Sequence, residues 1–336
     1  MINFGIVGFG LHAVKRLMPG FQAAKNCRVI ALSRRTQNKA TESARQYNIP
    51  LAFDSADALC HSPEVDAVLV ATPNACHLQD VLLALKCRKA VLCEKPMAVN
   101  AAQCRQMVEA AAKANLLLGV AQVFRFEEST AGLKDRLAAG QIGKVILARS
   151  EFSAPVTPSH PRTWINDLAV SGGGPIADLG VHCVDALRFV LQDEVVSVSA
   201  RGFADPCSGD VEAAAVMILE FSRGTLATVS VSFRGQYRTP FELVGETGVL
   251  RADDAFNVER PIQLELRRAG TIVESQSVSN HAAYTRQVEI FAAAVETTGK
   301  FPVPGEEGWR NQQILDAAYR SLKSGKTENV MKPDQQ

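Results

Sequence analysis

The sequence has no excess of charge of either sign. Its 36 basic and 35 acidic side chains leave a formal net charge of +1, so the chain lacks the electrostatic footprint with which proteins bind nucleic acid or an anionic membrane surface. It also lacks an uninterrupted apolar run of about 18 residues, the length that a membrane-spanning helix needs. We therefore expect neither a nucleic-acid partner nor a membrane partner.

Patterns that would indicate a metal site or disulfides are also missing. The eight cysteines include no Cys-x-x-Cys pair and no spacing typical of a zinc site, so we expect reduced cysteines and no bound metal. The first residues do not combine a basic segment with an apolar one, as a secretory signal peptide would. These observations favour a cytoplasmic protein.

What is present is the composition of a globular protein, since 47% of the 336 residues are hydrophobic and 21% are charged. A chain of this length usually folds as two domains. Up to residue 122, short apolar runs alternate with helical patterns, which is typical of a doubly wound parallel sheet with helices on both faces. The expected strands are 4–7, 29–33, 67–71, 90–93 and 116–121. We therefore predict an α/β domain over residues 1–122.

Beyond residue 122 the chain changes to runs in which polar and apolar residues alternate, joined by short turns. The expected strands are 145–152, 195–202, 213–221, 225–233, 241–244 and 262–266, and helices are expected at 284–297 and 309–323. Such alternation indicates an antiparallel sheet. We predict that residues 123–336 form a substrate-binding and oligomerisation domain of the α+β class with an open antiparallel sheet, and that its last segment packs back on the first domain.

The run 213–221 is apolar at almost every position, so both faces of that strand need a cover. The sequence leaves two covers open, the chain's own helices and a partner subunit. Because burial of a sheet face by a twofold-related copy is a common solution, we expect a homodimer or homotetramer formed through the sheet of the second domain.

A glycine motif follows the first expected strand. Gly8 and Gly10, followed by Leu11 and Ala13, match the pattern G-x-G-x-x-G/A between a strand and a helix. Gly8 would permit the tight turn, Gly10 would let the backbone approach a pyrophosphate, and the helix that begins at Leu11 would face the phosphate charge. The motif predicts that the first domain is a Rossmann domain that binds a dinucleotide.

The end of the second strand bears on which dinucleotide is bound. An NAD site normally has a carboxylate there, bound to the ribose 2′-hydroxyl, but residues 28–39 contain no acid. Ser33, Arg34 and Arg35 stand in its place, and arginine binds phosphate through paired, charge-assisted hydrogen bonds. We therefore expect NADP as the preferred cofactor. The alternative is that both arginines are solvated and that the cofactor is NAD.

Polar residues follow two further strands of the first domain. The carboxyl ends of the strands are where open α/β sheets bind ligands, so we expect these residues beside the nicotinamide half of the cofactor. They are Thr72, Pro73, Asn74, His77, Glu94 and Lys95.

In the second domain, a glycine-rich turn precedes a helical pattern with polar residues at regular intervals. Asp178, His182 and Asp185 are spaced i, i+4 and i+7, which places them on one face of a helix, next to an apolar stripe that can pack against the sheet. A hydride that leaves a carbinol carbon must be matched by loss of the hydroxyl proton, and an imidazole titrates near neutral pH. His182 is therefore a candidate base.

The chain resembles the Gfo/Idh/MocA oxidoreductase family, which includes glucose-fructose oxidoreductase and inositol dehydrogenase. The resemblance covers nearly the whole chain and rests on Gly8 and Gly10, residues 71–74 with His77, Glu94–Lys95–Pro96, Arg125–Phe126, Gly173–Gly174, Asp178 and His182, and later Gly245, Gly248, Phe291, Ala318–Tyr319 and Ser321. It implies a Rossmann domain, NAD or NADP, and a polyol or sugar substrate. It further implies a catalytic trio of Lys95, Asp178 and His182, a cofactor contact at Arg125, and a cis bond between Lys95 and Pro96.

Some roles stay open at this stage. Either Lys95 or His182 takes the proton, and Asp178 either orients the imidazole or binds a second hydroxyl. Trp164 and Tyr237 are candidates for substrate contact, with a core or surface role as the alternative. We expect an NADP-preferring dehydrogenase or reductase for a sugar, sugar acid or cyclitol; the alternatives are a non-catalytic nucleotide-bound regulator and an NAD-dependent glycosidase.

Overall fold

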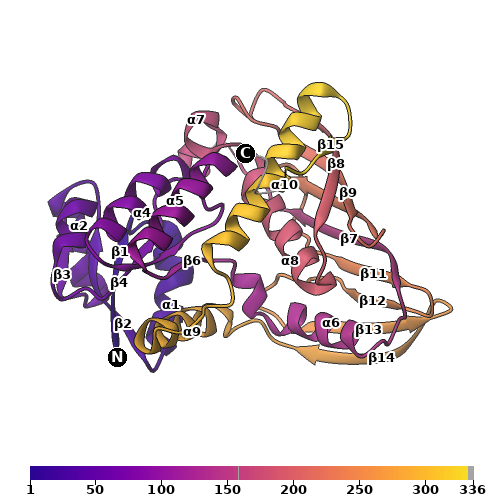
Figure 1. Cartoon of the computed structure of the whole chain (residues 1–336), viewed down its shortest axis with the longest axis horizontal. Helices are drawn as coiled ribbons and strands as arrows, with labels where there is room; N and C mark the ends of the chain where they lie inside the picture. Colours follow the sequence, from indigo (N-terminus) through magenta and orange to yellow (C-terminus); the bar gives the residue numbers. More distant parts are fainter. Residues whose placement is uncertain (158, 332–336) are drawn as a thin grey trace. The chain divides into compact units, whose positions relative to one another are not determined.

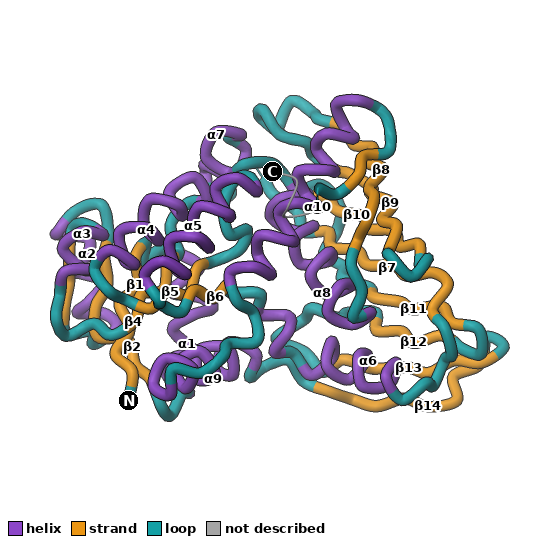
Figure 2. The backbone as a smooth tube through the Cα atoms, viewed as in Figure 1, coloured by secondary structure: helices purple, strands orange, loops and turns teal. Residues whose placement is uncertain are grey.

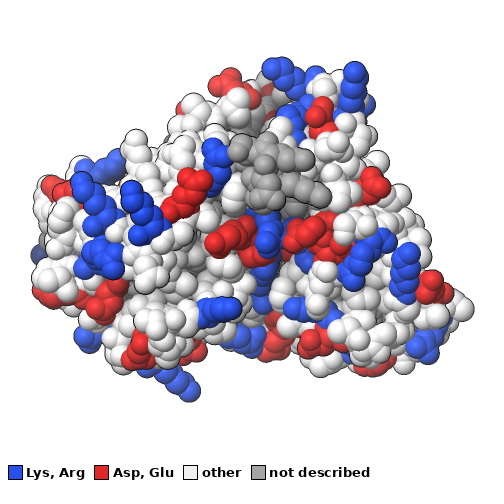
Figure 3. Space-filling view, viewed as in Figure 1, with Lys and Arg blue, Asp and Glu red and all other residues white. Residues whose placement is uncertain are grey.

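The computed structural model describes residues 1–157 and 159–331, and the chain divides into two compact units (Figure 1). Unit 1 comprises Met1–Gln122 and Tyr284–Arg310, and unit 2 comprises Val123–Ala283 and the chain from Asn311 onward. Within the described ranges, no helix is long and apolar enough to cross a membrane. Basic and acidic side chains are interspersed across the face shown in Figure 3.

Unit 1 is built on a six-stranded parallel sheet in the order β3-β2-β1-β4-β5-β6. The strands are β1 (Ile2–Val7), β2 (Cys27–Ser33), β3 (Leu51–Phe53), β4 (Ala67–Val70), β5 (Ala90–Cys93) and β6 (Leu118–Val120). This order confirms the predicted Rossmann topology. The strand order reverses between β1 and β4, which is where such sheets bind ligands. β3 was not predicted, because three half-buried residues give no periodic signal.

The helices of unit 1 are α1 (Met18–Ala23), α2 (Gln37–Tyr47), α3 (Ala56–His61), α4 (His77–Lys86), α5 (Ala101–Ala114) and α9 (Ala283–Thr297). α5 shows how the sequence sets the bounds of a helix. Asn100 caps α5 by accepting a hydrogen bond from the Gln103 N–H, and Asn115 ends it in the left-handed conformation. Phe291 of α9 packs 6.0 Å from Phe4 of β1, ring centre to ring centre, so this late helix shares the core of unit 1.

Unit 2 contains a nine-stranded sheet in the order β14-β13-β12-β11-β7-β10-β9-β8-β15. The strands are β7 (Val145–Ser153), β8 (Val195–Phe203), β9 (Ala214–Phe221), β10 (Leu226–Ser232), β11 (Phe241–Gly245), β12 (Val249–Ala252), β13 (Ile262–Arg268), β14 (Thr271–Val278) and β15 (Glu328–Asn329). The structure thus contains the open sheet that we predicted for this α+β domain. One pair differs from the expected antiparallel arrangement: β7 and β10 are parallel. A parallel pair needs a crossover connection, and residue periodicity does not show which strands pair.

Helices cover one face of this sheet (Figure 2). They are α6 (Glu128–Ala138), α8 (Val181–Leu191) and α10 (Gly305–Ser324), whereas the short α7 (Leu168–Ser171) lies before α8 in the chain. On β9, Met217 and Leu219 point into the core, while Val216 and Ile218 are 49% and 50% exposed. The chain's own helices therefore cover one face of β9 and leave the other open.

Candidate functional site

The glycine turn at the end of β1 has the conformation that the motif predicts. Gly8 has a φ of +85°, and a Cβ there would lie 2.7 Å from the backbone nitrogen of Thr72, so only glycine fits. A Cβ on Gly10 would meet nothing closer than 3.8 Å. The space beside Gly10, at the beginning of the following helix, fits a pyrophosphate.

The end of β2 carries the residues expected to select the cofactor. Ser33 is buried, and the Arg34 guanidinium donates a hydrogen bond to the Ser43 hydroxyl on α2, with 2.7 Å between the atoms. Arg35 is exposed, and both arginines directly follow the carboxyl end of β2.

His77 holds the loops after β4 and β5 together. It is fully buried, with Nε2 lying 2.9 Å from the Thr72 carbonyl oxygen and Nδ1 lying 3.0 Å from the Pro96 carbonyl oxygen. Burial lowers the pKa of this imidazole. Each ring nitrogen thus faces a backbone carbonyl oxygen of one loop, and the neutral imidazole donates its single N–H to one of the two. The buried ring fills the space between the loops. Thr72 is fixed further by donating from its hydroxyl to Asp80.

The loop after β5 brings Glu94 to the glycine turn. The Lys95–Pro96 bond is cis, as the family resemblance implies. One carboxylate oxygen of Glu94 lies 2.9 Å from His12 Nε2, and the other accepts a hydrogen bond from the Lys95 N–H. Burial raises the pKa of Glu94, but the charges of His12 and Lys95 together bring it below its usual value.

His12 has no predicted role from its sequence position, although it lies inside the glycine motif. The His12–Glu94 contact was therefore not predicted. It joins the phosphate turn to the loop that carries Lys95.

In unit 2, Asp178 and His182 lie on one continuous helical segment, which runs through a π-helical stretch, Ile176–Gly180, into α8. His182 is 7% exposed, and its ring stacks on Phe124 with 4.2 Å between ring centres. Phe152 lies 5.8 Å from the same imidazole. His182 is thus packed against two aromatic rings, an environment that the sequence did not reveal because these phenylalanines are distant along the chain.

Asp178 is engaged by an arginine from the irregular segment before α7. Two nitrogens of the Arg162 guanidinium donate to the two carboxylate oxygens, at 3.1 and 3.0 Å. Although burial acts against the charge of Arg162, Asp178 raises the pKa of the guanidinium above its usual value. This pair was not predicted, since Arg162 stands 16 positions earlier in a segment without periodicity.

The two candidate substrate contacts lie in the same neighbourhood of unit 2. The Arg162 guanidinium carbon lies 5.9 Å from the centre of the Trp164 ring. Tyr237 is largely exposed and packs edge-on against Phe152, with 6.1 Å between ring centres. Trp164 is therefore linked to Asp178 through Arg162, and Tyr237 is linked to His182 through Phe152.

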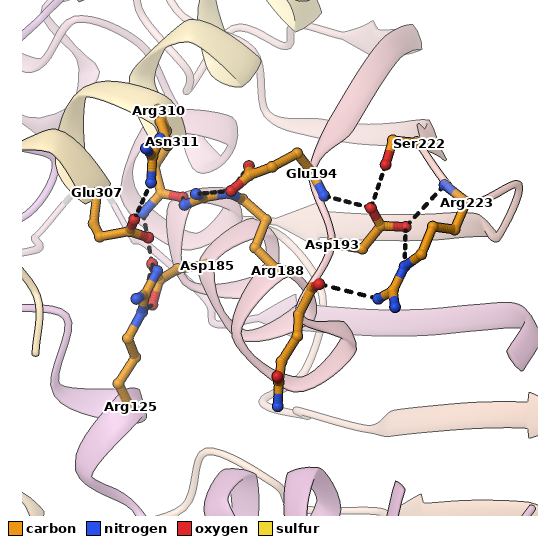
Figure 4. A network of polar contacts seen from close by, with 11 residues as sticks. Arg125, Asp185, Arg188, Asp193, Glu194, Ser222, Arg223, Glu307, Arg310 and Asn311 are labelled. Atoms are coloured by element: carbon orange, nitrogen blue, oxygen red, sulfur yellow. Dashed lines mark hydrogen bonds and ion pairs between the residues drawn. The ribbon is translucent and has the colours of Figure 1, made fainter. Parts of the chain in front are cut away.

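Arg125 is bound within unit 2 by a buried ionic network (Figure 4). Its guanidinium donates to both oxygens of Asp185, at distances from 2.7 to 3.1 Å. Asn311 donates to the same carboxylate and accepts from Arg188, which in turn pairs with Glu194. Asp185 thus lies on the predicted helix face, but its partner is Arg125.

Of the predicted trio, Lys95 belongs to unit 1, and Asp178 and His182 belong to unit 2. Among the residues that the structure describes, no group of three or more histidine, cysteine, aspartate or glutamate side chains could hold a metal ion. The chemistry that these groups can support is acid-base and electrostatic: unit 1 supplies a lysine at the sheet edge of its glycine turn, and unit 2 supplies an imidazole and a carboxylate.

Comparison with known proteins identifies both parts of the chain. Residues 2–122 match the family model described as the oxidoreductase family with an NAD-binding Rossmann fold, and residues 130–251 match the GFO/IDH/MocA C-terminal domain. D-xylose 1-dehydrogenase (NADP⁺) 2 of Haloferax volcanii is 31% identical, over 96% of this chain and 98% of its own. 1,5-Anhydro-D-fructose reductase of Ensifer adhaerens is 30% identical, over 92% of each chain.

A solved structure shows the same fold. The aldose-aldose oxidoreductase of Caulobacter crescentus, complexed with glycerol, matches with a TM-score of 0.89 and 24% identity, over 98% of this chain and 99% of its own. Together with the family models, this match confirms the predicted fold class. The chain belongs to the Gfo/Idh/MocA family of NAD(P)-dependent oxidoreductases that act on CH–OH groups.

Proposed function

We propose that this protein is an NADP-preferring oxidoreductase that transfers a hydride between the nicotinamide and a secondary hydroxyl, or the matching ketone, of a sugar, sugar acid or cyclitol. The observation that carries the proposal is the helical segment that presents Asp178 and His182 in one unit, in a chain whose other unit has the Gly8 turn and Lys95 at one sheet edge. The relatives named for D-xylose and 1,5-anhydro-D-fructose support the substrate class.

The cofactor would be held by three sets of residues in unit 1. Gly8, Gly10 and Leu11 would bind the pyrophosphate at the beginning of the helix, and Ser33, Arg34 and Arg35 would bind the 2′-phosphate. The nicotinamide half would lie beside Thr72, Pro73, Asn74, Glu94 and Lys95, with His77 fixing the loops from behind. When bound, the nicotinamide supplies the hydride acceptor or donor.

The residues of this chain would manage the proton and the charge on oxygen. His182 takes the hydroxyl proton during oxidation, and its ring is held by the stacked Phe124. Lys95 donates a hydrogen bond to the reacting oxygen and stabilises the developing alkoxide. Because Arg162 already binds both oxygens of Asp178, we assign this pair to binding a second hydroxyl of the substrate.

The exposed face of the unit 2 sheet supports a homodimer or homotetramer. Leu147, Val216, Ile218 and Leu226 form an outer apolar patch on the adjacent strands β7, β9 and β10, and each is about half exposed. A self-complementary patch of this kind is what a twofold interface requires. We propose that a second copy of the chain covers it.

A spectrophotometric screen tests the proposed activity. Sugars, sugar acids and inositols would be offered with NADP and with NAD in parallel, while reduced cofactor is followed by its absorbance; ketoses and keto acids would be offered with the reduced forms. We expect turnover of at least one polyol with a higher kcat/KM for NADP than for NAD. Cofactor binding without hydride transfer to any of these compounds would contradict the proposal.

A further inference from the structure

Two motifs of the sequence have no part in the proposed chemistry: the glycine run before Asp178, and Tyr319 with Ser321 on α10. The structure joins them through Glu212, which lies two residues before the first residue of β9. The Glu212 carboxylate accepts hydrogen bonds from the Ile176 N–H at 2.8 Å, the Gly174 N–H at 3.2 Å and the Tyr319 hydroxyl at 3.1 Å. All of these residues lie in unit 2.

The glycines are required by this arrangement. Gly173 has a φ of +149°, and a Cβ there would lie 1.7 Å from the Tyr319 hydroxyl oxygen. A Cβ on Gly174 would lie 2.3 Å from the carbonyl oxygen of Glu212. The turn is therefore shaped to close directly on Tyr319 and Glu212, and no larger residue fits at either position.

The two backbone N–H groups that donate hydrogen bonds to Glu212 lie at the start of the helical segment that carries Asp178 and His182. They are among the donors that a helix leaves without internal partners, and a carboxylate suits the positive end of the helix dipole. The same segment meets the sheet again at Gly180, where a Cβ would lie 3.3 Å from the Met217 side chain. Contacts before and within the segment therefore fix its position on the sheet.

Tyr319 is itself held in place by its helix. Two positions later, the Ser321 hydroxyl accepts a hydrogen bond from the Ala200 N–H of β8 at 2.8 Å and donates to the Lys326 carbonyl. Burial raises the pKa of Tyr319 well above its usual value, and the Glu212 charge raises it further, so the phenol remains a donor. Burial also raises the pKa of Glu212, while its three donors lower it in part.

We propose that Glu212, held by Tyr319, is a positioning residue that sets the orientation of His182 and Asp178. The catalytic meaning of this proposal rests on the proposed function, but the geometric claim does not. Glu212 contacts neither of the two side chains in any described hydrogen bond; it acts through the backbone at Gly174 and Ile176.

The test compares Glu212→Gln with Tyr319→Phe and with Glu220→Gln, a control on the exposed face of β9, the strand that follows Glu212. Glutamine replaces one carboxylate oxygen by an amide, so it cannot accept from all three donors. The histidine ring resonances of uniformly ¹⁵N-histidine-labelled protein are recorded, with His182→Ala used to assign that of His182. We expect Glu212→Gln to shift the His182 resonance and to lower kcat about tenfold or more, with the KM for cofactor within about twofold.

We expect Tyr319→Phe to give a smaller effect of the same kind and Glu220→Gln to give none. Should Glu212→Gln fail to fold, the resonance shift in Tyr319→Phe decides the question. An unchanged His182 resonance in the folded variants, or a wild-type kcat in Glu212→Gln, would overturn the proposal. Because the resonance needs no substrate, absence of activity in the wild-type protein would sink the proposed function while leaving this geometric test intact.

Discussion

At the scale of single residues, the proposed preference for NADP rests on two guanidinium groups at the end of β2, those of Arg34 and Arg35. Arg34→Ala combined with Arg35→Ala should weaken NADP binding by at least tenfold more than NAD binding, because only NADP carries the phosphate that the arginines would bind. Cofactor dissociation constants from fluorescence titration measure this. Arg45→Ala, an exposed arginine at the end of α2, is the control. Equal weakening of both cofactors would contradict the phosphate-binding role.

Glu127 carries a pH-dependent contribution to stability. Its side chain is fully buried, and burial raises its pKa well above the usual value of 4.5, with Ser129 offsetting this only in part. The folded protein therefore holds a proton on Glu127 that the unfolded chain releases, so the free energy of unfolding falls as pH rises above about 4.5.

Urea denaturation at pH 5, 6.5 and 8 checks this contribution. Glu127→Gln, which keeps the neutral form at every pH, should lose less stability than the wild type between pH 5 and pH 8. Identical pH slopes in the two proteins would show that Glu127 is not the titrating group.

The sequence predicted the positions of residues that follow a strand end or a helical spacing: Gly8 lies after β1, Lys95 lies after β5, and Asp178 and His182 lie on one helical segment. Partners that the fold brings from distant segments were missed. Neither Arg162 beside Asp178 nor Glu212 at the glycine turn carries a local signal. The position of Glu212 depends on how the strands pair, and that of Arg162 depends on an irregular segment. Neither strand pairing nor an irregular segment produces a periodic pattern in the sequence.

At the scale of elements, a buried ionic network ties α8 to the residues before α6 and to α10. Asp185→Ala would leave the buried Arg125 guanidinium without its carboxylate, and removing one partner of a buried pair costs about 3–5 kcal/mol. We expect the free energy of unfolding to fall by that amount. Asp253→Ala, which removes an exposed partner of Arg251, should change it by less than about 1 kcal/mol.

Chemical denaturation of the two variants measures the difference. A loss in Asp185→Ala no larger than in Asp253→Ala would mean that the network does not stabilise unit 2.

Long elements with a strong pattern, such as α5 and the buried strands of unit 1, were predictable because one face or both are apolar. β14 was missed because its residues are exposed at nearly every position and lack an apolar period.

At the scale of the whole molecule, the outer apolar patch on β7, β9 and β10 is exposed in a single copy of the chain. Placing charge there should break a sheet-to-sheet interface. We expect the wild type to sediment as a dimer or tetramer and Val216→Lys with Ile218→Lys to sediment as a monomer. Glu42→Lys, an exposed position on α2 of unit 1 and so outside the patch, is the control for the change of charge alone. A wild-type monomer at micromolar concentration would contradict the proposed assembly.

In the proposed function, Lys95 and His182 act on the same reacting oxygen of the substrate. A double-mutant cycle of Lys95→Ala and His182→Ala, measured as kcat on the best substrate of the screen, tests it directly. Each single variant should lose about 10²–10⁴ in kcat with little change in cofactor affinity, and the double variant should lose scarcely more than the weaker single variant, because groups that act as a unit are not additive. Losses that multiply in the double variant would show that the two residues act independently, and full activity in either single variant would remove it from the site.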